Sequence, residues 1–272
     1  MIRGRWATRS RERLGITTGL CTVVLAACLA LTPATAVEVG HDQEEASQGK
    51  ASLPSAFLLE FELERGGVHS ASAQIRLRPL GDGEWLYQRR TRAAGWAAIL
   101  YPAVITESSR WTREAGAIRP HAYTYRRTGN RPREVDVNLD WEAGRAANTL
   151  DGETWSMTVP PRTQDKLSVE LAMIEAMTAG RPELDIPVAD GGHLKTYTFQ
   201  ALGEEELDTE LGRLRTLMVE RLRDGSDRTA TYWLAVDHHH LPVQVIQYEA
   251  GETANRMTLT RMHINGRVVG QP

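Results

Sequence analysis

Three consecutive histidines, His238, His239 and His240, are the residues of this chain that most directly suggest chemistry. Successive side chains of a strand point to opposite faces, so His238 and His240 would share a face and form two arms of a metal site. A zinc site needs at least a third ligand, which the sequence does not place beside them. The alternative is a turn that Asp237 opens and Pro242 closes by starting the next strand, with exposed histidines between them. We favour the turn, expect no metal or cofactor, and expect any role of the histidines to be protonation near pH ~6.5.

The common motifs of catalysis are absent from the sequence. It has no G-x-S-x-G turn, no phosphate-binding loop, no G-x-G-x-x-G and no H-E-x-x-H. The acidic run at residues 203–212, GEEELDTELG, is interpreted as an exposed hairpin, because paired acid–base catalysis needs two carboxyl groups that meet across a cleft. We therefore expect a protein that is not an enzyme, and keep a metal-assisted enzyme as the least favoured alternative.

Most of the chain has the alternating pattern of β-strands. Phe57, Leu59, Phe61 and Leu63 alternate with glutamates, and residues 135–141 repeat the pattern. The dipeptide at residues 82–83, Asp-Gly, is a strong hairpin signal. Roughly twelve such runs predict an antiparallel sandwich or barrel.

The sequence predicts one helix, from Asp165 to Gly180. Asp165 can cap its start by accepting backbone N–H bonds, and Gly180 stands where a left-handed C-cap is wanted. The apolar stripe is broad, so the helix should be buried on most of its girth. We expect a mainly β fold: one strongly curved antiparallel sheet, a barrel or half-barrel, with this helix on its concave face.

A curved sheet of this size often encloses one ligand. The uncharged, loop-like stretch at residues 93–104 would cover such a cavity or contact a protein partner. The residues that we expect to line a ligand site are Trp96, Leu100, Tyr101, Leu171, Ile174 and Trp233.

The first 36 residues have the parts of a secretory signal peptide. Five arginines precede an apolar run, and Ala34 and Ala36 form an A-x-A end. One alternative is a retained membrane anchor, because the apolar run is nearly long enough to span a bilayer. Another is a lipoprotein signal, because "LAAC", which ends at Cys28, resembles a lipobox. We favour cleavage after Ala36 and export to the periplasm, with an outer-membrane lipoprotein through Cys28 as the alternative. Residues 37–54 then form a flexible linker, and residues 55–272 a single β-rich domain.

Cleavage after Ala36 would remove both cysteines and leave 27 basic and 34 acidic residues. The mature chain would have no disulfide, no thiol nucleophile and no transmembrane segment. An acidic chain without a basic run is a poor nucleic-acid binder.

Several spaced motifs resemble the bacterial exported family known as domain of unknown function 3108. They are Asp165, Leu167 and Ser168 at a helix start; Gly203 and Glu205 before Thr209 and Gly212; Trp233, Leu234, Ala235 and Asp237 before Leu241, Pro242 and Val243; and Gly116 with Pro120 at a strand entry. The similarity covers most of residues 55–262. It implies an exported β-rich domain with no established activity or catalytic residues.

We therefore expect an envelope protein that binds or carries an apolar ligand or lipid. The alternative is a structural or interaction protein that docks an envelope protein partner.

Overall fold

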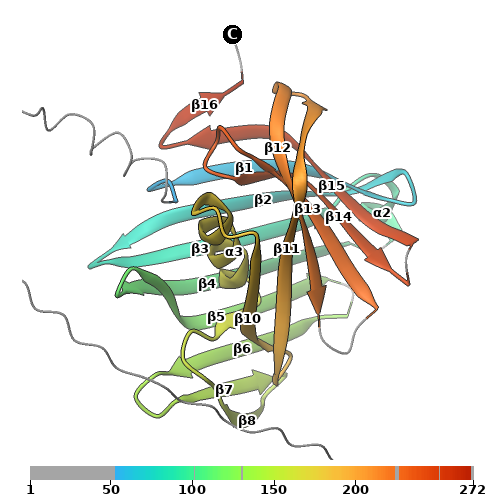
Figure 1. Cartoon of the computed structure of the whole chain (residues 1–272). Coiled ribbons are helices and arrows are strands. Elements are labelled where there is room, and N and C mark those ends of the chain that lie inside the picture. Colours follow the sequence, from blue (N-terminus) through green and yellow to red (C-terminus); the bar gives the residue numbers. More distant parts are fainter. Residues whose placement is uncertain (1–52, 101, 130, 224–226, 251, 271–272) are drawn as a thin grey trace, which may run out of the picture. The chain divides into compact units, whose positions relative to one another are not determined.

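The computed structural model describes residues 53–100, 102–129, 131–223, 227–250 and 252–270. Within these residues the chain is mainly β, with two short helices (Figure 1). The predicted signal peptide, Cys28 and Tyr101 lie outside the described residues, as does the predicted linker except for Leu53 and Pro54.

Sixteen strands belong to one sheet, and two helices lie between strands. The elements are β1 (Phe57–Arg65), β2 (Val68–Gly81), β3 (Glu84–Ala93), α2 (Gly95–Leu100), β4 (Ala103–Glu114), β5 (Ala117–Gly129), β6 (Arg133–Asp140), β7 (Arg145–Leu150), β8 (Glu153–Thr158), β9 (Gln164–Asp165), α3 (Ser168–Thr178), β10 (Glu183–Asp190), β11 (His193–Thr209), β12 (Gly212–Arg223), β13 (Arg228–Ala235), β14 (Leu241–Glu249), β15 (Glu252–Ile264) and β16 (Arg267–Val269).

The sheet is open and almost wholly antiparallel. Its order is β8-β7-β6-β5-β4-β3-β2-β1-β15-β14-β13-β12-β11-β10-β9, and β16 pairs with β15. Only β9 and β10 pair in parallel. The mainly β, antiparallel prediction is confirmed. The sequence predicted about twelve strands and the structure has sixteen; β9 and β16, of two and three residues, account for part of the difference because they are too short to show a pattern.

The alternation of β1 is the clearest link between sequence and structure. Phe57, Leu59 and Phe61 are buried, while Glu62 is exposed. The hairpin between β2 and β3 likewise forms where the sequence predicted it. Asp82 and Gly83 both have positive φ angles, 50° and 75°, as a two-residue hairpin of type I′ requires.

The predicted helix forms as α3 but is shorter at its start. Asp165 belongs to β9, three residues before the helix, and its carboxylate accepts the backbone N–H groups of Leu167 and Ser168 at 2.7 and 2.8 Å. At the other end Gly180 has a φ of 71°, and the N–H of Arg181 donates to the carbonyl of Ala176. The expected left-handed cap is therefore present.

Side chains from separate strands contact α3 and the segment before it. Glu170 of the helix accepts hydrogen bonds from Tyr87 and Arg89 of β3, and Glu175 pairs with Arg113 of β4. The helix also packs against β5, β9 and β10. Most of its residues are buried, as its broad apolar stripe predicted.

The stretch at residues 93–104 is not simply a loop. It contains α2, a helix of six residues that packs against β2 and β3. Sequence periodicity missed it because fewer than two turns give too few residues to show a period.

Two distant parts of the sheet meet through Trp155. The indole Nε1 of this β8 residue donates to the carbonyl oxygen of Gly192, in the turn between β10 and β11, at 3.3 Å.

The hydrophobic core contains residues from nearly all the strands. Trp111 belongs to it: this side chain is 1% exposed, and its ring stacks on that of Trp85 with the centroids 5.6 Å apart. None of the described helices is long and apolar enough to cross a membrane.

Candidate functional site

A cavity of about 410 Å³ lies among charged side chains from many strands, and we call it the polar cavity. The alternation of side chains along each strand determines which of these residues face the cavity. Arg89 shares a face of β3 with the fully buried Tyr87, and Arg221 shares a face of β12 with the fully buried Val219. The lining residues are Arg65, Arg89, Glu107, Lys166, Glu170, Tyr197, Arg221, Arg228, Thr229, Gln247, Tyr248, Glu249, Ala254 and Asn255.

Arg89 is held by two carboxylates. Its guanidinium donates to Glu170 at 2.5 Å and lies 3.9 Å from Glu107. Burial lowers the pKa of Arg89, but these carboxylates raise it above the ordinary value of an arginine. Glu170 also accepts the hydroxyl of Tyr87 at 3.3 Å, and Glu107 that of Tyr123 at 2.7 Å. The charge of Arg89 is therefore compensated inside the protein.

Arg221 has a different environment. One terminal nitrogen of its guanidinium donates to the hydroxyl of Tyr232 at 3.3 Å, and the group stacks on the ring of Tyr197 at 5.3 Å. Its Nε, like that of Arg89, is buried and has no hydrogen-bond partner among the described residues. In the part of the chain that the structure describes, Arg221 has no carboxylate partner within salt-bridge distance.

The lining as a whole is cationic. Five arginine and lysine side chains face three glutamates. Arg228 pairs with Glu249 at 2.7 Å, and Arg89 engages the other two glutamates. The cavity therefore suits an anionic group better than a neutral or cationic one.

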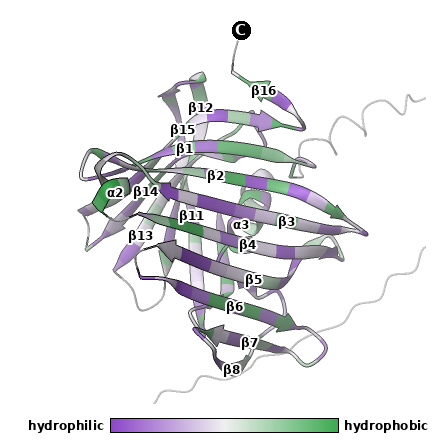
Figure 2. Cartoon of the chain, turned by 180° about the vertical axis from the view of Figure 1, so that it is seen from behind, coloured by the Kyte–Doolittle hydropathy of each residue, from purple (hydrophilic) through white to green (hydrophobic). Residues whose placement is uncertain are grey.

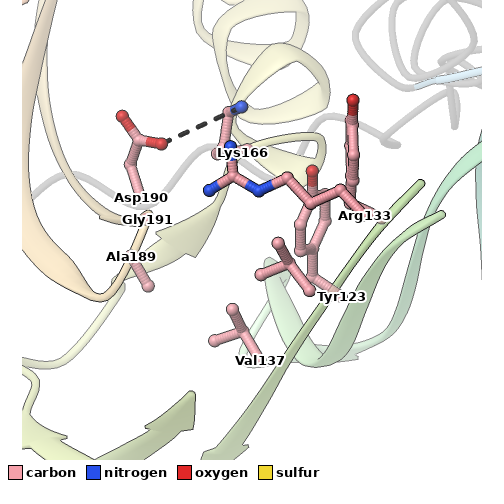
Figure 3. A pocket seen from close by; sticks show the side chains of 9 residues that line it. Tyr123, Arg133, Val137, Lys166, Ala189, Asp190 and Gly191 are labelled. Atoms are coloured by element: carbon pink, nitrogen blue, oxygen red, sulfur yellow. Dashed lines mark ion pairs between the residues drawn. The ribbon is translucent and has the colours of Figure 1, made fainter. Parts of the chain in front are cut away.

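A smaller pocket of about 240 Å³ adjoins the polar cavity and shares Lys166 with it. Figure 3 shows Arg133 and Lys166 reaching into this tyrosine pocket from different elements, beside Tyr123. Lys166 lies 3.9 Å from Asp190, which also accepts bonds from Lys195 and from Tyr197 of the polar cavity. Burial raises the pKa of Asp190, but the two lysines more than offset it and hold that pKa below its usual range.

Asp165 is the most deeply buried acid near these cavities. Besides the two backbone N–H groups, its carboxylate accepts the hydroxyl of Ser109 of β4 at 2.5 Å. Burial raises its pKa to about 6, although these hydrogen bonds act in the opposite direction. The group fixes the start of α3 against β4.

The three histidines lie in the turn between β13 and β14, as the favoured interpretation predicted. The prediction that they are exposed was wrong: all three are half-buried, because His240 turns toward α3 and contacts Thr178 through Nδ1 at 3.2 Å. Burial lowers the pKa of His238 and of His240. Asp237 pairs with Arg215. No group of three metal-ligating side chains occurs among the described residues.

The four predicted lining residues whose side chains the structure describes lie in different surroundings. Leu171 and Ile174 lie in the packed core, and Leu100 is exposed. Trp233 follows Tyr232 on β13, so it faces away from the polar cavity and donates to Glu205 of β11. The Trp96 side chain and Tyr101 lie outside the described residues.

Sequence reasoning missed the arginines of the polar cavity. A signal was present, because Arg89 and Arg221 stand two residues from apolar residues of the same strand face. The pattern could not show that these faces meet, since Arg89 and Glu170 are 81 residues apart in the sequence.

The fold and the cavity together define a class: an open, β-barrel-like antiparallel sheet with a charged cavity. The chain belongs to the family described as protein of unknown function, DUF3108, which it matches over residues 60–260. This confirms the resemblance found in the sequence. No curated protein matches the chain.

Two solved structures are similar to this chain in fold. One is a β-barrel-like protein of domain of unknown function DUF1849 from Brucella abortus, with a TM-score of 0.53, 12% identity, and coverage of 78% of this chain and 98% of the other. The other is a protein with a YmcC-like fold from Bacteroides fragilis, with a TM-score of 0.36, 9% identity, and coverage of 78% and 97%.

Proposed function

We propose that this chain is an exported envelope protein that binds a small anionic ligand, through a carboxylate or phosphate group, in the polar cavity. The observation that carries the proposal is Arg221, a buried guanidinium that lines the cavity without a carboxylate partner in the described residues. Export rests on the signal peptide that the sequence predicts.

A buried charge is costly unless it is paired and hydrogen-bonded. Arg89 forms salt bridges with Glu170 and Glu107, whereas Arg221 forms none in the described residues and is stabilised by Tyr232, Tyr197 and the more distant charge of Glu170. Stacking on Tyr197 covers a face of the guanidinium, and carboxylates and phosphates accept hydrogen bonds from its edge. A bound anion would supply the missing partner.

The residues that line the polar cavity favour a different class of ligand from the one that the sequence suggested. The sequence suggested a wholly apolar ligand or lipid, but the polar cavity presents eight ionisable arginine, lysine and glutamate side chains. We therefore place an anionic group in the cavity and make no claim on the rest of the ligand. The proposal requires that the sheet curves around α3 and that the ligand binds in the polar cavity.

We propose binding rather than catalysis because the carboxylates of the cavity are already engaged. Glu170 accepts hydrogen bonds from Tyr87 and Arg89, and Glu107 accepts one from Tyr123. Glu249 pairs with Arg228. A general base needs a carboxylate that is free to reach a substrate proton.

The test is calorimetric titration of the chain recovered from the envelope of expressing cells. Inorganic phosphate, laurate and the neutral dodecanol serve as probes. Arg221→Met should weaken binding of the preferred anion at least tenfold. Arg76→Met, at an exposed arginine of β2 outside this cavity, should leave it unchanged. Binding should also raise the unfolding temperature of the wild-type chain by mass action.

Phosphate and laurate distinguish the two anion classes. Equal binding of laurate and dodecanol would support the wholly apolar ligand instead and overturn the anionic one. The proposal also fails if neither anion binds at millimolar concentration, or if Arg221→Met binds as tightly as the wild type.

A further inference from the structure

The most exposed apolar side chains of the described residues gather at one place. Ile99 is 74% exposed, Leu100 64% and Val68 60%, and no other large apolar side chain in the described residues exceeds them. Ile99 and Leu100 belong to α2, which packs against β2, while Val68 is the first residue of β2. Figure 2 shows α2 as a strongly hydrophobic segment beside the end of β2. We call these three residues the apolar tip.

Arginines without ion pairs surround the apolar tip. Arg65 is paired with Val68 across the β1–β2 hairpin, and Arg92 lies two residues before Ala94, whose N–H donates to the carbonyl of Ser70. Neither arginine is within 4.0 Å of a carboxylate among the described residues. The nearby Glu62 faces His69 at 3.5 Å.

The turn between β5 and β6 brings two more arginines to the same place. A Cβ at Gly129 would lie 2.0 Å from the carbonyl oxygen of Pro102, so the turn is pressed against the residue two positions after α2 ends. Arg127 and Arg131 flank Gly129, and neither has an ion pair in the described part of the chain. Arg65, Arg92, Arg127 and Arg131 form what we call the arginine rim.

The polar cavity lies at the same end of the strands. Arg65 lines it, as do the start of β13 and the end of β14, at Arg228 and Glu249, and the start of β15 at Asn255. The register joins these ends: Arg228 pairs with Glu249, Glu249 with Glu252, and Arg256 with Glu64 of β1. The apolar tip and the cavity therefore lie at the same end of the strands.

We propose that the apolar tip and the arginine rim dock this protein on an anionic lipid bilayer. Three side chains offer far less than the ~800 Å² per partner of a stable protein interface. A bilayer demands less, because a few apolar side chains enter the boundary between headgroups and acyl chains while nearby arginines attract anionic lipids. Docking brings the polar cavity to the lipid surface.

The experiment is cosedimentation of the envelope-recovered chain with lipid vesicles. Vesicles of phosphatidylethanolamine with phosphatidylglycerol should bind the chain at low salt, and vesicles of phosphatidylcholine alone should bind it weakly. The double variant Ile99→Asp, Leu100→Asp should lower binding at least tenfold. Leu202→Asp is the matched control, since Leu202 of β11 is also half exposed but lies away from α2.

A second double variant tests the rim separately. Arg92→Gln with Arg131→Gln should reduce the preference for anionic vesicles and the dependence on salt. All four substituted positions are exposed, so each variant should unfold at the temperature of the wild type.

The proposal is overturned if the wild type does not sediment with anionic vesicles, or if Leu202→Asp weakens binding as much as the α2 variant. Self-association that the α2 variant abolishes, without vesicle binding, would identify a protein partner and equally overturn it. Arg221→Met should bind vesicles normally, so failure here is distinguishable from failure of the proposed ligand site.

Discussion

Two half-buried arginines of one cavity differ in their direct partners. Arg89 forms salt bridges with Glu170 and Glu107, while Arg221 contacts Tyr232 and Tyr197 and has no salt-bridge partner among the described residues. A buried charge that lacks a counter-charge lowers stability, and it is retained where function needs it. The difference between these two residues is the clearest sign at the residue scale that the cavity serves binding.

The same substitution should therefore have opposite effects at the two positions. Arg221→Met should raise the free energy of unfolding of the ligand-free chain by about 1–2 kcal/mol, because it removes a half-buried charge that has no salt-bridge partner in the described residues. Arg89→Met should lower it by about 3–5 kcal/mol, because it leaves two buried carboxylates without their cation. Urea unfolding of both variants measures the signs. Destabilisation by both would show that Arg221 is structural.

Asp165 predicts a pH dependence of stability. Its pKa is about 6 in the folded chain, because of burial, against ~3.9 in an unfolded one. The folded state therefore binds the proton more tightly, so stability increases as pH falls from 6 toward 4 and is lost as pH rises through 6. A raised pKa of this size corresponds to a cost on the order of 3 kcal/mol above pH 6.

Asp165→Asn should remove that cost and keep the cap, since an amide oxygen can still accept the N–H groups of Leu167 and Ser168. We expect the variant to be more stable than the wild type at pH 8 and equal to it near pH 4. Asp185→Asn, at an exposed carboxylate of β10, is the control. An Asp165→Asn chain that is less stable at pH 8 would contradict the burial argument.

At the scale of elements, β8 is joined to the distant β10–β11 turn through Trp155 and Gly192. A Cβ at Gly192 would lie 2.2 Å from a ring carbon of Trp155, so only glycine allows the indole to approach. Its φ of 79° also favours glycine. The contact between two parts of the sheet thus depends on one residue without a side chain.

Gly192→Ala should destabilise the chain by more than Gly191→Ala. Both glycines have positive φ angles, but a Cβ at Gly191 would meet nothing within 4 Å. Gly191→Ala should therefore show only the backbone strain, of about 1–2 kcal/mol. Gly192→Ala should lose a further ~1–3 kcal/mol as the Trp155 ring is displaced. Denaturant unfolding, with tryptophan fluorescence, measures both. Equal losses would mean that the contact contributes nothing.

The sequence predicts structural features well where they depend on a few neighbouring residues. The alternation of β1, the Asp82-Gly83 turn and the Gly180 cap are all local, and all three form as expected. It fails where several segments must meet. The six-residue α2 is too short to show a period, and the faces that carry Arg89 and Arg221 look like ordinary polar alternation.

At the scale of the whole molecule, the sheet depends on contacts that span nearly the whole described chain. The first strand, β1, pairs with β15 near the C-terminus, about 200 residues later. Non-local pairing of this kind is formed late, because the chain must close a long loop first. One edge of β1 can pair early with β2, but its other edge stays unpaired until β15 is available, which is compatible with export of an unfolded chain.

Export predicts the mass of the mature protein. The A-x-A end at Ala34 and Ala36 should direct cleavage after Ala36, so that the intact mass of envelope-recovered protein begins at Val37. Cys28→Ser should then leave processing unchanged, because Cys28 is removed with the leader. Arginine in place of both Ala34 and Ala36 should instead block cleavage, because the site requires small residues. A mass that begins at an acylated Cys28, lost in Cys28→Ser, would establish a lipoprotein anchored to the membrane by lipid chains in place of a released one.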